Sequence, residues 1–234
     1  MAELSLDEQK ISDRACDYVR DHKKDLIAQF ADPILYTADD RAVALFMAGS
    51  PGAGKTEVSR RLIETFKKKP VRIDADAIRE FVPGYEGEKA YLYQRAANKG
   101  VNLLLEHVLK KKINFILDGT FAYQDVELNI ERCLKRGRPI EIYYVYQEPQ
   151  RAWELVVARE AIEHRRVSKE VFVRSFFAAR NNVEMIKSKF GTMIDLCVIE
   201  KNFSTGQEQI FTTVTSLDQC IPKTYTQLEL EGMI

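Results

Sequence analysis

The sequence has few cysteines and no apolar run long enough to cross a membrane. Its four cysteines, Cys16, Cys133, Cys197 and Cys220, lie far apart and form no Cys-x-x-Cys pair. This spacing argues against a disulfide framework or a zinc site and favours buried thiols in a reducing compartment. The N-terminal stretch "MAELSLDEQKISDRACDYVR" is too polar for a secretory signal peptide. We therefore expect a cytoplasmic protein that does not engage a membrane.

An excess of charge of either sign is also absent. Lysine plus arginine number 35, and aspartate plus glutamate number 35 as well, so no overall field attracts the chain to nucleic acid. The lysine runs at 67–69 and 110–112 each end an expected helix, where cations suit the helix dipole. The histidines, His22, His107 and His164, stand alone, so no metal site built on them is expected. No nucleic-acid partner is predicted.

Strand-like apolar runs alternate with helical patterns, and 234 residues suffice for one well-buried α/β domain. This alternation predicts a mostly parallel sheet with helices on both faces. The last two strands flank the turn "NFSTGQ" and predict a C-terminal hairpin. We expect strands at 42–49, 71–74, 113–118, 140–146, 194–200 and 209–213. We expect helices after residue 55, over 88–112 and 125–136, and over 148–190 with a break near Arg165.

Residues 5–30 carry apolar side chains at helical spacing among charged ones, which predicts one amphipathic helix or two. Packing against the main domain is the simpler interpretation of this pattern, and binding of a partner is the other. We divide the chain into an N-terminal helical extension packed on the core, 1–36, and a main α/β domain, 37–234.

The segment "GSPGAGKT" stands between the first expected strand and a helix. It fits GxxxxGK[ST], a loop whose backbone N–H groups surround phosphate oxygens at a helix N-terminus. Lys55 is expected to reach the β- and γ-phosphates, and the Thr56 hydroxyl to hold Mg²⁺. We therefore predict a P-loop that binds ATP with Mg²⁺. Its nucleotide-binding residues are Gly49, Ser50, Pro51, Gly52, Ala53, Gly54, Lys55 and Thr56.

Two further absences favour a kinase over a GTPase or a motor. The sequence has no NKxD-like guanine reader, and the strand at 113–118 ends "ILDGT" with one acid instead of an acidic pair. A kinase needs a carboxylate for the acceptor, a substrate platform and cations for the transferred phosphoryl group. The chain has candidates for all three, so we expect 37–234 to be a P-loop kinase domain.

The candidate carboxylates follow two strands. Asp74 and Asp76 stand where the second strand leaves the sheet, and they share one face near the P-loop if the strand persists. Asp76 serves as the base in this interpretation; in the other it caps the helix that follows. Asp118 and Thr120 close the third strand, where parallel sheets bind ligands. A turn residue or an indirect Mg²⁺ contact are the alternatives for Asp118.

The candidate cations are Arg159, Arg165 and Arg166 in "VVAREAIEHRRVSKE", which spans the expected helix break. Small kinases close a helical lid over ATP, and arginines there stabilise the charge of the transition state. A solvated helix face is the alternative, and the sequence does not separate Arg165 from Arg166.

Taken together, the motifs resemble the zeta toxin family, P-loop kinases related to chloramphenicol phosphotransferase. The resemblance covers roughly residues 40–215, through the P-loop, "IDADAIREFVPGY", "FILDGTFAYQDV" and the lid arginines. It implies a phosphotransferase that uses ATP to phosphorylate a sugar hydroxyl of UDP-N-acetylglucosamine, and it admits an antitoxin protein as a partner. It also implies roles for Asp76 as the base, Lys55, Arg159 and Arg165 on the phosphates, and Thr120 on the substrate.

Two positions depart from the family pattern on the acceptor side. Counted without gaps, Asn102 stands at the family's substrate-binding glutamate, and Ala122 stands at an arginine. The loss of a carboxylate and a guanidinium changes polar recognition of the substrate strongly. The candidate substrate contacts are Asp74, Asp118, Thr120 and Asn102. Other residues that could hold the sugar nucleotide are Tyr123, Lys99 or Arg95. Two alternatives stay open. One is a kinase for another metabolite or a polynucleotide end, and the other is a nucleotide-dependent toxin or effector module with little turnover.

Overall fold

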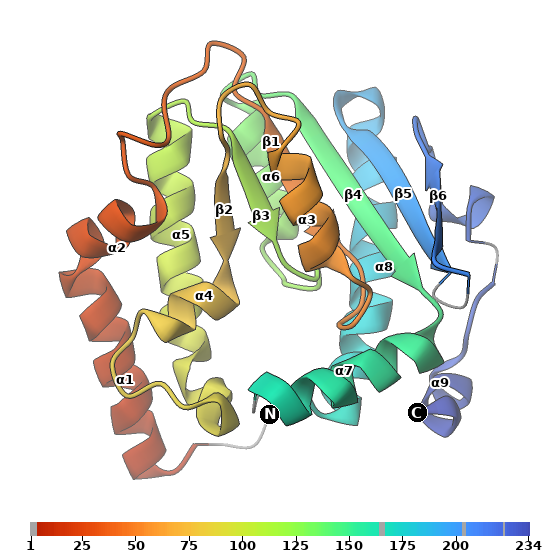
Figure 1. Ribbon diagram of the computed structural model, residues 1–234, viewed down its shortest axis with the longest axis horizontal. Coiled ribbons are helices and arrows are strands. Elements are labelled where there is room, and N and C mark those ends of the chain that lie inside the picture. The colour runs from red at the N-terminus through yellow and green to blue at the C-terminus, as the bar shows by residue number, and fades with distance from the viewer. Residues whose placement is uncertain (1–3, 164–166, 203–204, 222) are drawn as a thin grey trace.

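The computed structural model describes residues 4–163, 167–202, 205–221 and 223–234. These residues form an α/β fold around one six-stranded sheet in the order β2-β3-β1-β4-β5-β6 (Figure 1). All neighbours pair in parallel except β5 and β6. The strands are β1 (Ala44–Ala48), β2 (Val71–Asp74), β3 (Phe115–Asp118), β4 (Ile140–Gln147), β5 (Asp195–Asn202) and β6 (Gln207–Phe211). The predicted fold class is confirmed.

Helices cover both faces of the sheet because alternate strand residues point to opposite sides. In β1, Phe46 faces the larger core on one side, whereas Leu45 and Met47 face a smaller core beneath α3. Double burial explains why this strand is an unbroken apolar run. The helices are α1 (Leu6–Asp21), α2 (Lys23–Phe30), α3 (Lys55–Ile63), α4 (Ala75–Glu80), α5 (Gln94–Lys110), α6 (Val126–Leu134), α7 (Pro149–Glu163), α8 (Lys169–Phe190) and α9 (Gln227–Met233). Short 3₁₀ helices are η1 (Gly87–Tyr93), η2 (Gly191–Met193) and η3 (Leu217–Gln219).

The N-terminal pattern forms two helices, α1 and α2, and both pack against α5. Ser5 begins α1 with a capping box, in which its hydroxyl accepts from the Glu8 N–H and the Glu8 carboxylate accepts from the Ser5 N–H. Val19 and Leu26 are fully buried within the larger core. The apolar face of this segment is therefore used in packing, and the division at residue 36 stays a prediction.

Several predicted boundaries differ from the structure. The helix predicted over 88–112 begins as the 3₁₀ helix η1 and becomes α-helical only at Gln94. The predicted hairpin is present as β5 and β6, but η3 and α9 follow it, and Leu230 of α9 is buried. Among the residues described, no helix is both long and apolar enough to cross a membrane.

Candidate active site

The P-loop joins β1 to α3 at the carboxyl end of the sheet, and α7 runs across the same end (Figure 1). Two of its glycines are required by space as well as by backbone conformation. A Cβ on Gly49, whose φ is +131°, would lie 2.2 Å from the Val145 carbonyl oxygen. A Cβ on Gly52, whose φ is +74°, would lie 2.0 Å from the Ala152 carbonyl oxygen of α7. The loop is thus fitted closely against β4 and α7.

Replacement of Gly52 by alanine is expected to destabilise the protein by about 2 kcal/mol or more, because a positive φ and a clash with backbone add together. Gly137→Ala is the matched control, since its φ is +63° but no atom lies within 4 Å of an added Cβ. Thermal unfolding should give a Tm for Gly52→Ala at least about 3 °C below that of Gly137→Ala. Equal Tm values would show that α7 does not constrain the loop.

Lys55, the first residue of α3, lies over the loop. Its Nζ donates to the Gly49 carbonyl at 3.0 Å and to the Ser50 carbonyl at 2.6 Å. The loop's own carbonyls therefore hold the ammonium beside the backbone N–H groups that are expected to receive phosphate.

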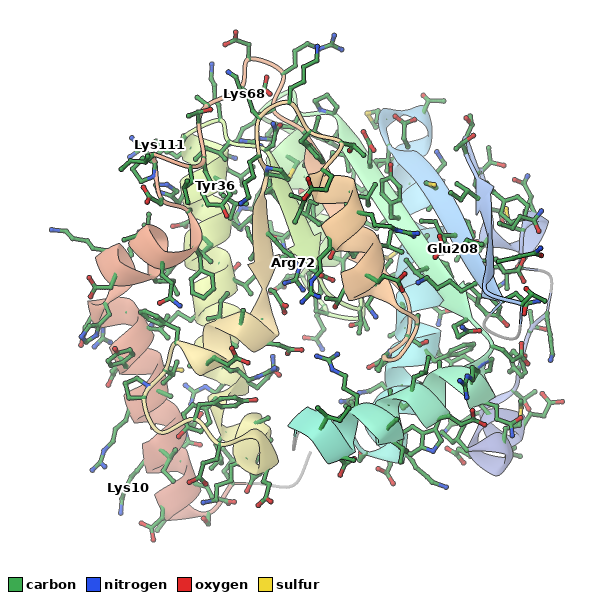
Figure 2. All side chains as sticks on the ribbon, in the orientation of Figure 1. Lys10, Tyr36, Lys68, Arg72, Lys111 and Glu208 are labelled. Atoms are coloured by element: carbon green, nitrogen blue, oxygen red, sulfur yellow. The ribbon has the colours of Figure 1, made fainter. Side chains whose placement is uncertain are left out.

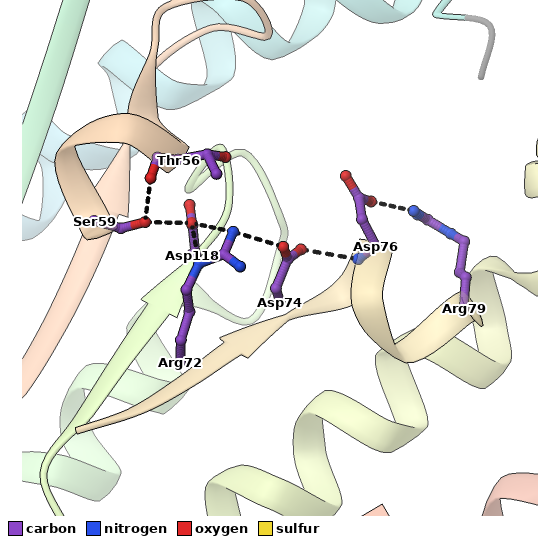
Figure 3. A network of polar contacts seen from close by, with 7 residues as sticks. All are labelled: Thr56, Ser59, Arg72, Asp74, Asp76, Arg79 and Asp118. Carbon is purple, nitrogen blue, oxygen red and sulfur yellow. Dashed lines mark hydrogen bonds and ion pairs between the residues drawn. The ribbon is translucent and has the colours of Figure 1, made fainter. Parts of the chain in front are cut away.

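Asp118, at the end of β3, is the centre of a polar cluster beside the P-loop helix (Figure 3). Its Oδ2 lies 2.7 Å from the Ser59 hydroxyl of α3, and its side chain is only 4% exposed. Nε of Arg72, a residue of β2, donates to the same oxygen at 2.8 Å, and Nη2 forms an ion pair with it at 2.7 Å. That Nη2 also contacts Asp74 Oδ2 at 2.7 Å. One guanidinium thus joins the carboxylates that end two neighbouring strands.

Asp76 is brought to this cluster by a helix cap. The structure ends β2 at Asp74, whose Oδ1 accepts from the Asp76 N–H at 2.9 Å and caps α4. The two carboxylates therefore do not continue one strand face, and Asp74, rather than Asp76, is the capping residue. The Asp76 carboxylate is 32% exposed and pairs with Arg79, one helical turn later.

Arg79 is almost completely buried beneath Asp76. Its guanidinium also donates to Gln94 at the start of α5, and its Nε has no hydrogen-bond partner in the described part of the chain. Burial lowers the pKa of Arg79, while the nearby Tyr85 and Asp74 act in the opposite direction. A buried cation thus fixes the carboxylate from below, while the carboxylate itself stays partly exposed.

The residues beside the P-loop have oxygen donors suited to Mg²⁺. Neither the Thr56 hydroxyl nor Asp118 Oδ1 makes a hydrogen bond with any described residue. Mg²⁺ is commonly held by one or two protein oxygens together with substrate phosphates. No group of three or more histidine, cysteine or acidic side chains suited to a metal occurs in the described ranges. The donor set fits a metal that binds together with a nucleotide.

The other predicted site residues lie in different places, and only some of them are close to the P-loop. The Thr120 carbonyl accepts from the Gly49 N–H at 3.2 Å, so Thr120 lies beside the P-loop. Arg159 lies on an exposed part of α7, and Arg165 lies outside the described residues. Asn102 is exposed on α5 and lines an open groove of about 480 Å³ with Cys16 of α1. It does not join the strand-end cluster, and the groove also includes Arg95 and Lys99.

Three residues of the cluster were not predicted: Ser59, Arg72 and Arg79. The sequence held a signal for each. Arg72 stands two residues before Asp74 and so shares its strand face. Ser59 and Arg79 each stand three residues after a predicted site residue on a helix, Thr56 and Asp76. The strand spacing of Arg72 and the helical spacing of Ser59 and Arg79 would have been enough to group these three residues with the site.

The P-loop between β1 and α3, the parallel sheet and the acidic strand ends define a protein of the P-loop kinase class. The zeta toxin family model matches residues 28–206, and the chain belongs to that family. No curated protein matches its sequence. Family membership and fold together support a nucleotide-dependent kinase or toxin.

Solved structures share the fold at low sequence identity. A chain of the PezAT chromosomal toxin–antitoxin system of Streptococcus pneumoniae aligns with a TM-score of 0.64 and 16% identity, over 99% of this chain and 93% of that one. A chain of the AvrRxo1-ORF1:-ORF2 complex with ATP aligns with a TM-score of 0.59 and 12% identity, over 88% and 67%. A chain of the Pnkp1/Rnl/Hen1 RNA repair complex gives 0.51 and 18%, over 63% and 47%.

Proposed function

We propose that this protein transfers the γ-phosphoryl group of ATP to a hydroxyl of a small molecule, with the sugar hydroxyl of UDP-N-acetylglucosamine as the leading acceptor. One observation carries the proposal. A continuous series of polar contacts runs from the Thr56 backbone carbonyl through Ser59, Asp118 and Arg72 to the Asp74 carboxylate, which accepts from the Asp76 N–H at the start of α4. The groups proposed to bind ATP, the phosphoryl donor, and those proposed to bind the acceptor hydroxyl are therefore connected at one end of the sheet.

The residues divide the chemistry between them. Backbone N–H groups of the P-loop and Lys55 bind the β- and γ-phosphates. Thr56 and Asp118 would hold Mg²⁺, which would supply positive charge to the phosphate oxygens. Asp76 orients the acceptor hydroxyl and takes its proton as the oxygen forms a bond to the γ-phosphorus. The bond from that phosphorus to the bridging oxygen breaks, and ADP leaves.

Among the remaining predicted residues, Arg159, Arg165 and Thr120 keep their proposed roles, whereas Asp74 and Asn102 do not. Arg159 and Arg165 supply charge from the lid, and Thr120 contacts the acceptor beside the P-loop. Asp74 caps α4 and acts on the acceptor through the position of Asp76. We leave Asn102 out of the acceptor site because it lines the groove shared with α1. An antitoxin partner is part of the proposal, in keeping with the toxin–antitoxin system named for one structural relative.

Incubation with ATP, Mg²⁺ and a pool of sugar nucleotides, other metabolites and oligonucleotides tests the acceptor. Mass spectrometry should show that UDP-N-acetylglucosamine gains one phosphate. The matched control is the same incubation with Asp76→Asn, which should yield no product. A phosphate on a different metabolite or on an oligonucleotide end would replace the acceptor. Tight ATP binding without any product would favour a nucleotide-dependent binding module instead.

A further inference from the structure

We propose that Arg72, a residue of strand β2, contacts the transferred phosphoryl group directly. The inference deepens the proposed function and rests on it in one respect, namely that ATP is the bound nucleotide. It assigns a catalytic contact to a residue of the sheet, separate from the lid arginines of α7 and its following segment. Figure 2 shows Arg72 near the centre of the molecule, beside α3 and β2.

The first argument is position. Arg72 bridges the two halves of the site, because one of its contacts is Asp118, which also lies against Ser59 of α3, and the other is Asp74, which caps the helix of Asp76. Figure 3 shows its guanidinium between these groups. In the proposed reaction, the phosphoryl group moves from the P-loop toward a hydroxyl at Asp76, and its path passes the Arg72 guanidinium between these two parts of the site.

The second argument is the hydrogen-bonding capacity that remains. Nε and Nη2 of Arg72 are used by the carboxylates, and both contacts to Asp118 converge on Oδ2. Nη1 has no hydrogen bond or ion pair with any described residue, and the side chain is 21% exposed. A guanidinium held at two nitrogens with a third one open is already ordered, so a phosphate oxygen gains a donor at little entropic cost.

The third argument is charge. Asp74, Asp76 and Asp118 place three carboxylates beside a site for a triphosphate, which is itself strongly anionic. Arg79 is almost entirely buried and is already engaged by Asp76 and Gln94. Arg72 is the partly exposed cation of this cluster, and arginine binds planar carboxylate and phosphate groups through several N–H donors at once. It therefore both neutralises the aspartates and offers charge to the phosphoryl group.

The test compares Arg72→Met, Arg72→Gln and Arg72→Lys with the matched control Arg61→Met. Arg61 lies on α3 and pairs with Glu208 of β6 at 2.6 Å, and Figure 2 shows Glu208 toward the hairpin side, away from Arg72. ATP and ADP affinities are measured by calorimetry, and phosphoryl transfer by single turnover. We expect Arg72→Met and Arg72→Gln to weaken ATP about tenfold more than ADP and to slow transfer about 10²-fold. Arg61→Met should leave each quantity within about twofold.

Arg72→Lys separates contact with the phosphoryl group from neutralisation of the aspartates. A single ammonium cannot bind both aspartates and a phosphoryl group at once. We expect transfer by this variant to stay at least about tenfold slow. Recovery to within about threefold, with an unchanged preference for ATP over ADP, would show that Arg72 only neutralises the aspartates. Equal loss of ATP and ADP binding together with a lower Tm would show a structural role. Arg72→Gln keeps donors for the carboxylates and so remains folded if Arg72→Met does not.

The affinity measurements need no acceptor. A wild-type protein that phosphorylates nothing, but whose preference for ATP over ADP depends on Arg72, would refute the proposed function and leave standing the contact between Arg72 and the γ-phosphate of ATP. The opposite result is that the wild-type protein phosphorylates an acceptor and that Arg72→Met keeps the same transfer rate and the same preference for ATP over ADP. It would support the proposed function and refute the contact of Arg72 with the phosphoryl group.

Discussion

Asp76→Asn is expected to reduce phosphoryl transfer by about 10³-fold or more while ATP still binds with nearly unchanged affinity. The amide cannot take the proton of the acceptor hydroxyl, yet its shape and its carbonyl oxygen remain. The phosphate contacts are expected from the P-loop and from Lys55, whose Nζ donates to the Gly49 and Ser50 carbonyls, so ATP affinity should depend little on the Asp76 carboxylate. Single-turnover transfer and ATP calorimetry on the same preparation measure both quantities.

The choice of asparagine follows from Arg79. This arginine is buried under Asp76 and pairs with it, so complete removal of the carboxylate leaves a buried cation without its partner, at a cost of several kcal/mol. Asparagine retains an acceptor for the Arg79 N–H groups. Asp76→Ala should therefore lose both activity and thermal stability, whereas Asp76→Asn should lose mainly activity. Activity of Asp76→Asn within a few-fold of the wild type would refute the assignment of Asp76 as the base.

The donor half of the site could be predicted from the sequence because its signals are local. The P-loop needs glycines at particular positions, a strand before it and a helix after it, and all lie within some twenty consecutive residues. Gly49 and Gly52 occupy positions where backbone oxygens of Val145 and Ala152 leave no room for a side chain. Local pattern and tertiary packing demand the same residues there, so the prediction needed no knowledge of the fold.

The pairing of charges could not be predicted in the same way because it depends on strand register. β2 and β3 pair in parallel with Asp74 opposite Asp118, and this alignment brings Arg72 within reach of both. The sequence shows two strands that each end in an acid but does not specify their relative shift. β2 ends at Asp74 as predicted and does not persist to Asp76, since Asp74 caps α4 through a contact that competes with continuation of the strand.

The position of Asn102 shows a different limit. Asn102 was placed by counting positions against the family pattern without gaps, and the helix expected over 88–112 is η1 followed by α5. A 3₁₀ helix has 3.0 residues per turn and an α-helix 3.6, so several residues of η1 rotate the following side chains around the axis. Asn102 is exposed on α5 and lies in the groove with Cys16. Gap-free counting transfers sequence position but does not transfer helical phase.

Lys55→Ala is expected to reduce phosphoryl transfer by about 10³-fold and to weaken ATP binding as well, in contrast to Asp76→Asn. The Gly49 and Ser50 carbonyls hold this ammonium directly on the P-loop. Its loss removes charge-assisted hydrogen bonds to the β- and γ-phosphates, both before and during transfer. ATP calorimetry and single-turnover transfer should therefore both change, and the matched control Lys67→Ala, an exposed lysine beyond α3, should change neither.

Growth of cells that express the protein extends this comparison from chemistry to toxicity. If the protein inhibits growth by phosphorylating a metabolite, Lys55→Ala and Asp76→Asn should both relieve the inhibition, although only the first weakens ATP binding. Relief by Lys55→Ala alone would mean that nucleotide binding without transfer suffices for toxicity. Persistent toxicity of Lys55→Ala, in a variant whose Tm shows it to be folded, would require a mechanism that uses neither ATP binding nor transfer. The two variants thus separate a toxic kinase from a toxic nucleotide-binding module.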